Sequence, residues 1–525
     1  PLFQSRPKLS RHPIRITTPD QHLRTKLQAL LQSNTITELG KNKVQSQPGF
    51  YCRAFTIPKP YTTERRFIFD LRPLNRHILT SKFKSESFRD ALTLIEPNDW
   101  LTSVDITEAY HHVPVHPDFQ KYLRFAVKDQ KQTRVFQFRA LPMGLNASAS
   151  IYVKMMKVPL AQLREQGIRI VAYMDDLLII SRSKEQAFQH TTKVLEILAE
   201  AGFTANLEKS ELEPTQSIKF LGMVIDTTTM MTKVPAIKVK KAQASVRRIW
   251  ASKNAGHTPA RLLSHLVGVI GSLYEAIPEV RTHLHHMKRC INAAVEPNRE
   301  WRNPITWTDM AHQELNFWST NLASLASQGR QFSMQPADFQ LVADSSQYAF
   351  GGAITAGAKL EWPKAELQVQ GQWTRQQKHQ HINHKELLAA FKVLRHFGTK
   401  FNWYRNAISI KLDNLVAVAY INRGGGRKTH LNSIMIEFNE WCKSRQIAVR
   451  AEYSKGELNI VADRLSREMP KQYCEWSLRT STFEQLQQVR GPFTFDVFAS
   501  HQNKRLQSFA PFRPHPENTI TDAFS

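Results

Sequence analysis

The feature that most constrains this chain is a pair of adjacent acids inside an otherwise apolar segment, residues 168–181. Residues 168–173 and 177–180 are rich in β-branched and large apolar side chains, which is typical of buried strands. Asp175 and Asp176 stand between these runs, and Asp tolerates the dihedral angles of tight turns. The pattern therefore predicts a hairpin whose two-residue tip is Asp175-Asp176. Adjacent carboxylates at such a tip favour a Mg²⁺ site, with an ordinary solvated turn as the alternative.

A second strand pattern also ends in an acid. Residues 101–104 are Leu-Thr-Ser-Val, and Asp105 follows them directly. Nucleotide transfer needs two metal ions roughly 4 Å apart, one for the attacking oxygen and one for the triphosphate. If the two segments meet, Asp105 and Asp175 can bridge both ions. The combination favours a two-metal phosphoryl-transfer site.

Four acids in the downstream half of the chain follow the same logic. Two of them end strand patterns, one lies early in a helical pattern, and one lies in a segment farther along. Acids placed in this way can converge on one cluster, and like charges gathered together need cations, which indicates a second two-metal site that hydrolyses phosphodiesters. The four acids are Asp344, Glu386, Asp413 and Asp463.

The charge balance indicates a polyanionic partner. Lys and Arg number 71 against 45 Asp and Glu, a net charge of +26, and such an excess points first to nucleic acid, with a generally basic surface as the alternative. The four cysteines lie far apart without a CxxC pair, which excludes zinc-finger spacing and a disulfide framework. No run of eighteen apolar residues is present, so no membrane partner is expected. We expect an intracellular protein of the cytoplasm or nucleus.

The pattern along the chain predicts five parts. Residues 1–17 are basic and aperiodic, which predicts a mobile arm, and Thr18 is expected to cap a helix that starts at Pro19. The chain begins with Pro1 and has no stop-like end, so we expect a piece of a longer reading frame. The expected parts are an arm and helix (1–47), an α+β unit (48–235), a helical segment (236–336), a second α/β unit (337–470) and a tail (471–525).

Several motifs occur in one order between residues 48 and 235. Tyr173 to Asp176 resembles the metal-binding box of reverse transcriptases, and Asp105 to Tyr110 resembles their preceding aspartate motif. The resemblance implies an α+β right-hand polymerase with fingers, palm and thumb, followed by a helical connection. The other matching motifs are Arg66–Asn75 in the fingers, Leu141–Ser148 under the template base, and Glu208–Ser210 and Phe220–Gly222 in the later palm and primer grip.

By this resemblance, Asp105, Asp175 and Asp176 form the metal-binding triad of the polymerase. Two Mg²⁺ ions are expected in each active site, with Mn²⁺ as a substitute. Lys209 stands where it can protonate the leaving pyrophosphate as a general acid, and an ordinary helix-end lysine is the alternative.

The resemblance also implies five residues that contact the substrate. Arg66 and Lys59 stand where fingers residues meet the incoming triphosphate, and a planar guanidinium suits phosphate oxygens. Tyr110 stands where a bulky ring excludes the 2′-hydroxyl, so deoxynucleotides are the expected substrates, with simple core packing as the alternative. Gly144 lets the backbone approach the template–substrate pair, and Tyr173 is expected to contact the substrate beside the acids.

The order and context of Asp344, Glu386, Asp413 and Asp463 resemble the RNase H fold, which implies four metal-binding acids in an α/β domain. Many such domains carry a mobile histidine about ten residues before the last acid, whereas this chain has Tyr453-Ser454 there. The difference is expected to slow product release without abolishing metal binding.

Two other motifs are assigned no catalytic role. His379, His381 and His384 are expected to pack or to contact substrate near Glu386, with a separate zinc site as the alternative. Gly424-Gly425-Gly426 lacks the Lys-Ser/Thr continuation of a phosphate loop, which predicts a flexible surface loop.

The tail resembles the segment that follows RNase H in DIRS-type retrotransposons, which integrate with a tyrosine recombinase. The resemblance rests on residues 495–500, Arg505 and residues 509–510. It implies a separate recombinase of the same element as a partner, and gypsy-type elements are the alternative.

The sequence predicts an RNA-directed DNA polymerase with RNase H activity. Its partners are an RNA template, a DNA primer, the RNA–DNA hybrid and deoxynucleotides. A catalytically inactive nucleic-acid-binding relic of a retroelement is the alternative from another class. An RNA-dependent RNA polymerase is opposed by Tyr110 and by the second acid cluster.

Overall fold

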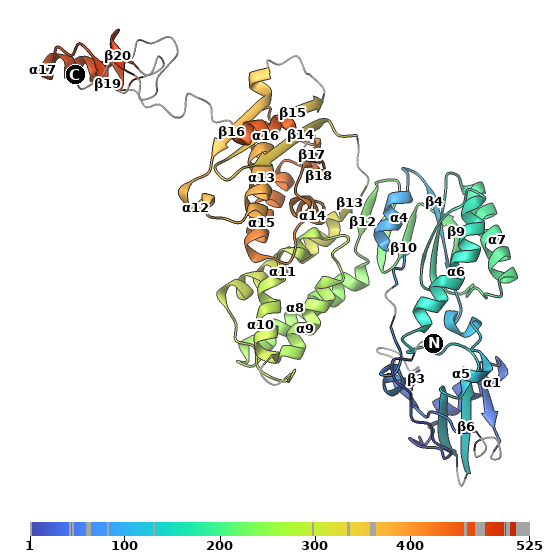
Figure 1. The fold of residues 1–525 in the computed structure, drawn as a ribbon. Coiled ribbons are helices and arrows are strands. Elements are labelled where there is room, and N and C mark those ends of the chain that lie inside the picture. Colours follow the sequence, from blue (N-terminus) through green and yellow to red (C-terminus); the bar gives the residue numbers. More distant parts are fainter. Residues whose placement is uncertain are drawn as a thin grey trace. The chain divides into compact units, whose positions relative to one another are not determined.

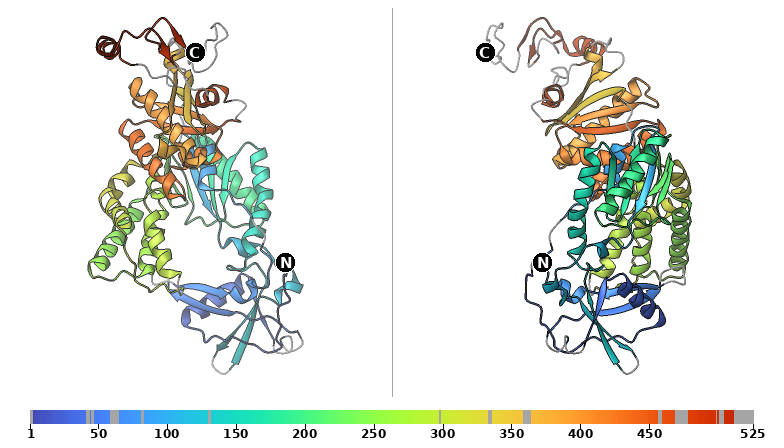
Figure 2. Two further views of the ribbon diagram at one scale, coloured as in Figure 1. Left: turned by 60° about the vertical axis from the view of Figure 1, so that its left-hand side comes forward. Right: turned by 90° about the vertical axis from the view of Figure 1, so that its right-hand side faces the viewer.

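The computed structural model describes residues 3–40, 44, 47–58, 65–80, 83–129, 132–296, 299–332, 336–357, 364–455, 459–467, 478–497, 499 and 504–510. The chain divides into two compact units, shown as ribbons in Figures 1 and 2. Among the helices of these ranges, none has both the length and the apolar character needed to cross a bilayer. The first unit holds Pro1–Ala244, Glu275–Ile277 and Asn321–Ser333, and the second holds Ser245–Tyr274, Pro278–Thr320 and Met334–Ser525.

The N-terminal part of the first unit is built around an antiparallel sheet of order β1-β6-β5 and a two-stranded ribbon, β2-β3. Helix α1 buries Leu23, Leu27 and Leu30 in the core that these strands share. Phe69 and Phe138 stack in this core with ring centroids 5.0 Å apart. The elements are α1 (Gln21–Gln32), β1 (Ile36–Leu39), β2 (Arg53–Pro58), β3 (Arg65–Asp70), α3 (Arg72–Asn75), α5 (Pro117–Gln120), β5 (Arg124–Asp129) and β6 (Gln132–Phe138).

Residues 3–17, here called the N-terminal strap, are hydrogen-bonded to the rest of the fold, so the prediction of a mobile arm is wrong. Isolated bridges join Phe3, Ser10 and Thr17 to three separate parts of the fold, and the ring of Phe3 lies 4.8 Å from that of Tyr122. These backbone hydrogen bonds need no apolar periodicity, which is why the pattern did not show them. The helix begins at Gln21 with Asp20 as its N-cap, rather than at Pro19, because the Asp20 carboxylate accepts from the Leu23 N–H at 2.7 Å.

The central sheet of the first unit is antiparallel, of order β7-β8-β4-β9. Strand β8 is buried almost throughout, and helices α6 and α7 share one core with it through Tyr152, Val194 and Ile179. A smaller sheet of order β10-β11-β12-β13 follows. The elements are α4 (Phe88–Leu94), β4 (Trp100–Asp105), η1 (Ala109–His112), α6 (Ser148–Glu165), β7 (Arg169–Tyr173), β8 (Asp176–Ser181), α7 (Lys184–Glu200), β9 (Glu211–Thr215), β10 (Ser217–Phe220), β11 (Met223–Asp226), β12 (Met231–Lys233) and β13 (Arg330–Gln331).

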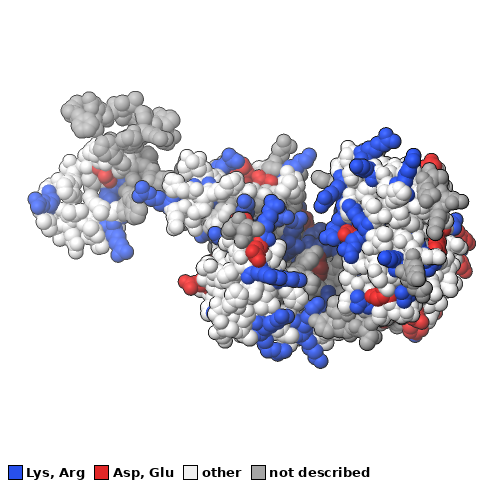
Figure 3. Space-filling model, turned by 90° about the horizontal axis from the view of Figure 1, so that it is seen from below, with Lys and Arg blue, Asp and Glu red and all other residues white. Residues whose placement is uncertain are grey.

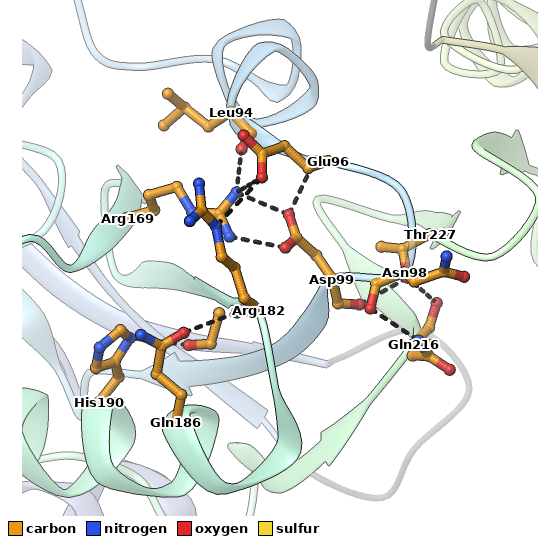
Figure 4. A network of polar contacts seen from close by, with 11 residues as sticks. Leu94, Glu96, Asn98, Asp99, Arg169, Arg182, Gln186, His190, Gln216 and Thr227 are labelled. Atoms are coloured by element: carbon orange, nitrogen blue, oxygen red, sulfur yellow. Dashed lines mark hydrogen bonds and ion pairs between the residues drawn. The ribbon is translucent and has the colours of Figure 1, made fainter.

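A buried ion pair fixes the end of this sheet that lies away from Asp105 (Figure 4). Arg169, the first residue of β7, donates to both carboxylate oxygens of Asp99, at 2.7 and 2.8 Å. Asp99 is only 2% exposed, and it also accepts from the Glu96 N–H at 2.6 Å. Its backbone carbonyl accepts from the Thr227 hydroxyl at 2.7 Å. Asp99 therefore joins the turn before β4 and strand β7 through its carboxylate, and the segment after β11 through its backbone carbonyl.

The second unit combines helices with a five-stranded mixed sheet of order β16-β15-β14-β17-β18. Strands β14, β17 and β18 are parallel, and β15 and β16 are antiparallel to their neighbours. Leu341 and Ile408 pack with helix α13, whereas Val342 packs with α16. Because alternate strand residues point to opposite faces, α13 and α16 cover opposite faces of the sheet.

The elements of the second unit follow α8 (Ala236–Asn254), which passes into it from the first unit, and α11 among them returns to the first unit at Asn321. They are α9 (Ala260–Gly271), η2 (Pro278–Arg281), α10 (His285–Val295), α11 (Asp309–Gln328), β14 (Phe339–Ser345), β15 (Ala349–Gly357), η3 (Lys364–Leu367), β16 (Gln368–Gln372), α12 (Arg375–Lys378), α13 (Ile382–Lys400), β17 (Ala407–Leu412), α14 (Leu415–Arg423), α15 (Thr429–Ser444), β18 (Ala448–Tyr453), α16 (Ile460–Arg467), α17 (Thr480–Arg490), β19 (Asp496–Val497) and β20 (Phe509–Ala510).

The triple-glycine loop is held in place, so the prediction of a flexible loop is wrong. The Asn432 side chain, 3% exposed, both accepts from the Gly426 N–H and donates to the Gly426 carbonyl, each at 2.9 Å. Gly425 has φ +135°, and a Cβ there would lie 2.8 Å from the Thr282 methyl group. Glycine therefore serves close approach to the segment after η2 rather than mobility.

Replacing Asp99 with Asn should destabilise the first unit by about 2–4 kcal/mol, because it removes a charge that a bidentate Arg169 contact requires in a buried setting. Urea or thermal unfolding of the full chain measures the change. Glu96→Gln is the matched control, since its side chain is 57% exposed and lies 3.9 Å from Arg169. Equal stabilities for the two variants would contradict the prediction.

Candidate active sites

The first acid cluster is assembled by strand register. Asp105, the last residue of β4, lies directly opposite Asp176, the first residue of β8, in an antiparallel ladder. Opposed residues have Cβ atoms about 4.5–5.5 Å apart. Asp175 precedes Asp176 in the β7–β8 turn. The structure thus brings the three acids to adjoining positions at one end of the sheet.

The turn that carries Asp175 differs by one residue from the prediction. Tyr173 pairs with Asp176, so the loop consists of Met174 and Asp175, and Asp176 belongs to β8. Within the loop only Met174 has a positive φ, +55°, the sign pattern of a type II′ turn. The prediction of an Asp175-Asp176 tip is therefore wrong. Propensity favoured Asp in the turn, whereas the pairing of β8 with β4 keeps Asp176 in the ladder.

The backbone around Asp105 is fixed by a segment about a hundred residues away in sequence. The Asp105 carbonyl accepts from the Asn206 N–H at 2.7 Å, and the Asp105 N–H donates to the Ser210 hydroxyl at 3.0 Å. The Ile106 N–H donates to the Asp175 carbonyl at 2.9 Å. None of these bonds uses a carboxylate oxygen of the cluster. Ser210 lay within a motif noted in the sequence, but Asn206 carried no signal there.

Burial and mutual repulsion raise the pKa of two acids in this cluster. Burial is the largest cause for Asp105 and Asp176, and the charge of Asp175 adds to it in both. The ammonium group of Lys209 acts in the opposite direction and lowers both pKa values. Lys209 itself is exposed. Its charge therefore reaches the acids from the solvent side.

Tyr110 borders the cluster. Its side chain is half-buried, and its ring makes an edge contact with the ring of Tyr152, with centroids 5.6 Å apart. Burial raises the pKa of Tyr110, and the charge of Asp175 raises it further, so the phenol lies within reach of that charge. Tyr152 is fully buried beneath it. The phenol ring is therefore held from below beside Asp175.

The structure places the other expected substrate residues less closely. Gly144 has φ +92°, and its carbonyl accepts from the Asn75 amide at 2.8 Å, which joins two of the sequence motifs. Tyr173 ends β7 and is 40% exposed. Arg66 is exposed on β3, and among the described contacts none joins it to the acids. Lys59 lies outside the described residues.

The second acid cluster forms at the carboxyl ends of two parallel strands. Asp344 lies near the end of β14, and Asp413 directly follows the neighbouring strand β17. Glu386 comes from the first turns of α13. One ligand oxygen from each of the three lies within 4.8 Å of the others. Parallel pairing therefore brings the two aspartates to one edge, and α13 delivers the glutamate.

Asp463 lies beside these three acids rather than among them. It is on α16, and its carboxylate accepts from Arg467 at 2.6 Å, one helical turn along. Its charge still raises the pKa of Asp344 and of Asp413. The hydroxyl of Ser466, on the same helix, donates to Asp344 at 2.5 Å. Ser466 is thus a part of the site that sequence reasoning missed.

The donor set of the second cluster suits a divalent cation. Burial, with the charges of Asp344 and Asp413, raises the pKa of Glu386 to about 9. The Glu386 Oε2 atom is buried without a hydrogen-bond partner among the described residues. Carboxylate oxygens are the ligands that Mg²⁺ prefers. The three acids therefore fit a metal ion that would relieve their repulsion and satisfy the unpaired oxygen.

Two nearby histidines have structural contacts: His381 caps helix α13, and His384 packs against another ring. The His381 ring accepts from the Asn383 N–H at 3.1 Å at the start of α13. The ring of His384 stacks on that of His430, with centroids 6.0 Å apart. Among the described residues, these rings are not part of a group of three metal ligands.

The comparisons with known proteins agree with the site geometry. Residues 57–225 match the family model "Reverse transcriptase (RNA-dependent DNA polymerase)". The enzymatic polyprotein of Cestrum yellow leaf curling virus is 23% identical over 443 residues, which cover 81% of this chain and 63% of that protein. The Gag-Pro-Pol polyprotein of Human T-cell leukemia virus 3 is 29% identical over 269 residues, 50% of this chain and 17% of that protein. The chain thus spans less than two thirds of these relatives.

A solved structure shares the fold. The foamy viral protease-reverse transcriptase in complex with dsDNA matches with a TM-score of 0.51 at 16% identity, over 85% of each chain. The polymerase fold of retroviral reverse transcriptases is therefore present. Residues 57–225 carry the family match and both strands of the Asp105–Asp176 pair. The chain contains a reverse transcriptase domain, and its relatives include viral polyproteins.

Proposed function

We propose that this chain copies RNA into DNA and then degrades the RNA strand of the hybrid. The observation that carries the proposal is the cross-strand pair Asp105–Asp176 beside the Asp175 turn, inside the matched reverse transcriptase domain. Residues 48–235 serve as fingers and palm, and residues 236–336 as thumb and connection. Residues 337–470 serve as the RNase H domain.

At the polymerase site, Asp105, Asp175 and Asp176 would hold two Mg²⁺ ions, or Mn²⁺ in their place. The ions would supply Lewis acidity to the primer 3′-hydroxyl and the triphosphate. Lys209 neutralises part of the acid charge and donates a proton toward the departing pyrophosphate. Tyr110 occupies the space beside Asp175 and excludes a ribose 2′-hydroxyl.

For the RNase H site, the support is topology together with chemistry. The assignment is supported by a mixed sheet, in which β14 pairs antiparallel with β15 and parallel with β17, with helices on both faces. Asp344, Glu386 and Asp413 would bind the ions, and Ser466 orients Asp344. Asp463 would join these three metal-binding acids when Arg467 leaves it, for example to contact a substrate phosphate.

Nucleic acid is the proposed partner of both units. The net charge is +26, and on the face drawn in Figure 3 blue Lys and Arg side chains outnumber red acids. A foamy viral relative by fold was solved with dsDNA. RNA template, DNA primer, hybrid and deoxynucleotides are the proposed ligands, held mainly through phosphates, so binding should weaken steeply with salt. The tail supports a DIRS-type element with a separate recombinase, and gypsy-type elements are the alternative.

Substitutions in the two acid clusters should separate the two activities. Asp176→Asn should reduce deoxynucleotide incorporation on an RNA template by at least about a hundredfold, because it removes a charge that metal binding needs, while hybrid cleavage continues. Asp413→Asn should reduce hybrid cleavage while deoxynucleotide incorporation continues. Primer extension and cleavage of a labelled hybrid measure the two. If the wild-type protein incorporates no deoxynucleotide with Mg²⁺ or Mn²⁺, the chain is an inactive relic.

The stability of the second unit should depend on pH through Glu386. Its folded pKa, about 9, lies above the usual 4.5, so its protonated form stabilises the fold below pH 4.5 and this contribution is lost as pH rises toward 9. In EDTA, the melting temperature of the wild type should therefore fall over this range more than that of Glu386→Gln. Mg²⁺ should raise the melting temperature of the second unit more in the wild type than in Glu386→Gln. Parallel pH curves for both proteins would count against the assignment.

Tyr110→Ala should increase ribonucleotide incorporation, because the ring beside Asp175 no longer excludes the 2′-hydroxyl. The ratio of kcat/KM for a deoxynucleotide and its ribonucleotide measures the effect. An unchanged ratio would contradict the assignment of Tyr110 as the sugar gate.

A further inference from the structure

The loop that connects Asp105 to Tyr110 has an unusual backbone at its tip. Its start is anchored, because Ile106 and Thr107 donate backbone hydrogen bonds to the Asp175 and Thr204 carbonyls, each at 2.9 Å. At the tip, Glu108 has φ +43° and ψ +46°, the left-handed conformation. This conformation is uncommon for residues other than glycine and must be stabilised by its surroundings.

A lysine and a histidine side chain hold the Glu108 carboxylate. Lys26, which comes from helix α1, contacts Oε1, and the Nδ1 atom of His111 lies 2.7 Å from Oε2. The hydrogen bond with His111, and then that with Lys26, lowers the pKa of Glu108 to about 2. The ring of His112 is also bonded to the Thr107 carbonyl, at 2.8 Å. The loop is thus held through side chains from its own turn and from a helix 82 residues earlier.

We propose that Lys26, Glu108 and His111 form a positioning network that sets how strictly the site distinguishes deoxyribose from ribose. This inference rests on the proposed function. Tyr110 follows Glu108 by two residues in the short turn η1, and it needs a fixed place relative to Asp175 to exclude a 2′-hydroxyl. Lys26 and Glu108 do not touch the substrate in this role. They act through the backbone that carries Tyr110.

The geometry explains why selectivity depends on this pair more than stability does. The Lys26 and Glu108 side chains are 35% and 39% exposed, so solvent screens their attraction and limits its effect on folding. The conformation at Glu108, however, sets the direction in which the chain enters η1. If Glu108 loses its partners, it can relax toward the right-handed region, and Tyr110 shifts with it. Misplacement by about 1 Å is enough to change rates strongly.

Kinetics of single-nucleotide incorporation on an RNA template test the proposal. Glu108→Gln and Lys26→Gln should each lower the kcat/KM preference for a deoxynucleotide over its ribonucleotide by about five- to tenfold, with a higher KM for the deoxynucleotide and a smaller change in kcat. Lys26→Arg keeps the charge and should keep the preference within twofold of wild type. Tyr110→Ala gives the upper limit of the effect.

The matched control is Glu38→Gln. It breaks an ion pair with Arg134 of similar exposure, bonded at 2.7 and 2.9 Å, on the sheet β1-β6-β5 of the same unit. This variant should leave sugar preference unchanged. Preferences within twofold of wild type for both Glu108→Gln and Lys26→Gln, while Tyr110→Ala alters it, would overturn the proposal. So would failure of both variants to fold, because the network would then be a stability element. Failure of the proposed function is distinct, since the wild type would incorporate no deoxynucleotide.

Discussion

Repulsion between buried or half-buried carboxylates is the constraint on which both sites depend. In each unit, acids are brought together by strand pairing, and burial together with neighbouring charge raises their pKa values. Such clusters cost folding energy unless a cation or a fixed positive side chain compensates them. The two units compensate differently. Lys209 acts on the first cluster from an exposed position, whereas Arg467 is paired with Asp463 in the second and its charge also lowers the pKa of Asp413.

Features that depend on neighbouring residues were easier to predict from the sequence than features that depend on tertiary pairing. Asp105, Asp344 and Asp413 each follow a short strand pattern, so their places at strand ends were predictable from alternation and propensity alone. The hairpin tip was predicted one residue too late, because propensity cannot show that Asp176 must remain paired with Asp105. Tertiary pairing decided the register, as it usually does when one face of a sheet is buried.

Other parts of the sites were not predictable because they depend on contacts between distant segments. Asn206 fixes the Asp105 backbone from about a hundred residues away, and Lys26 reaches Glu108 across 82 residues. A single polar residue outside any periodic pattern has no local signature of such a role. Ser466 was closer to prediction, since it stands three residues after Asp463, but its hydroxyl points to Asp344. The N-terminal strap was missed for the same reason, because isolated backbone bridges leave no periodicity.

The triple-glycine loop has a consequence for anyone who alters this protein. By composition, residues 424–426 look like a permissive linker in which to insert a tag or a foreign domain. In the fold, added atoms at Gly424, Gly425 and Gly426 would lie 3.1 Å or less from Pro278, Thr282 and Tyr420. The absence of side chains is what lets two parts of the second unit lie against each other. An insertion point chosen by glycine content would therefore fall in a packed contact between two parts of the second unit.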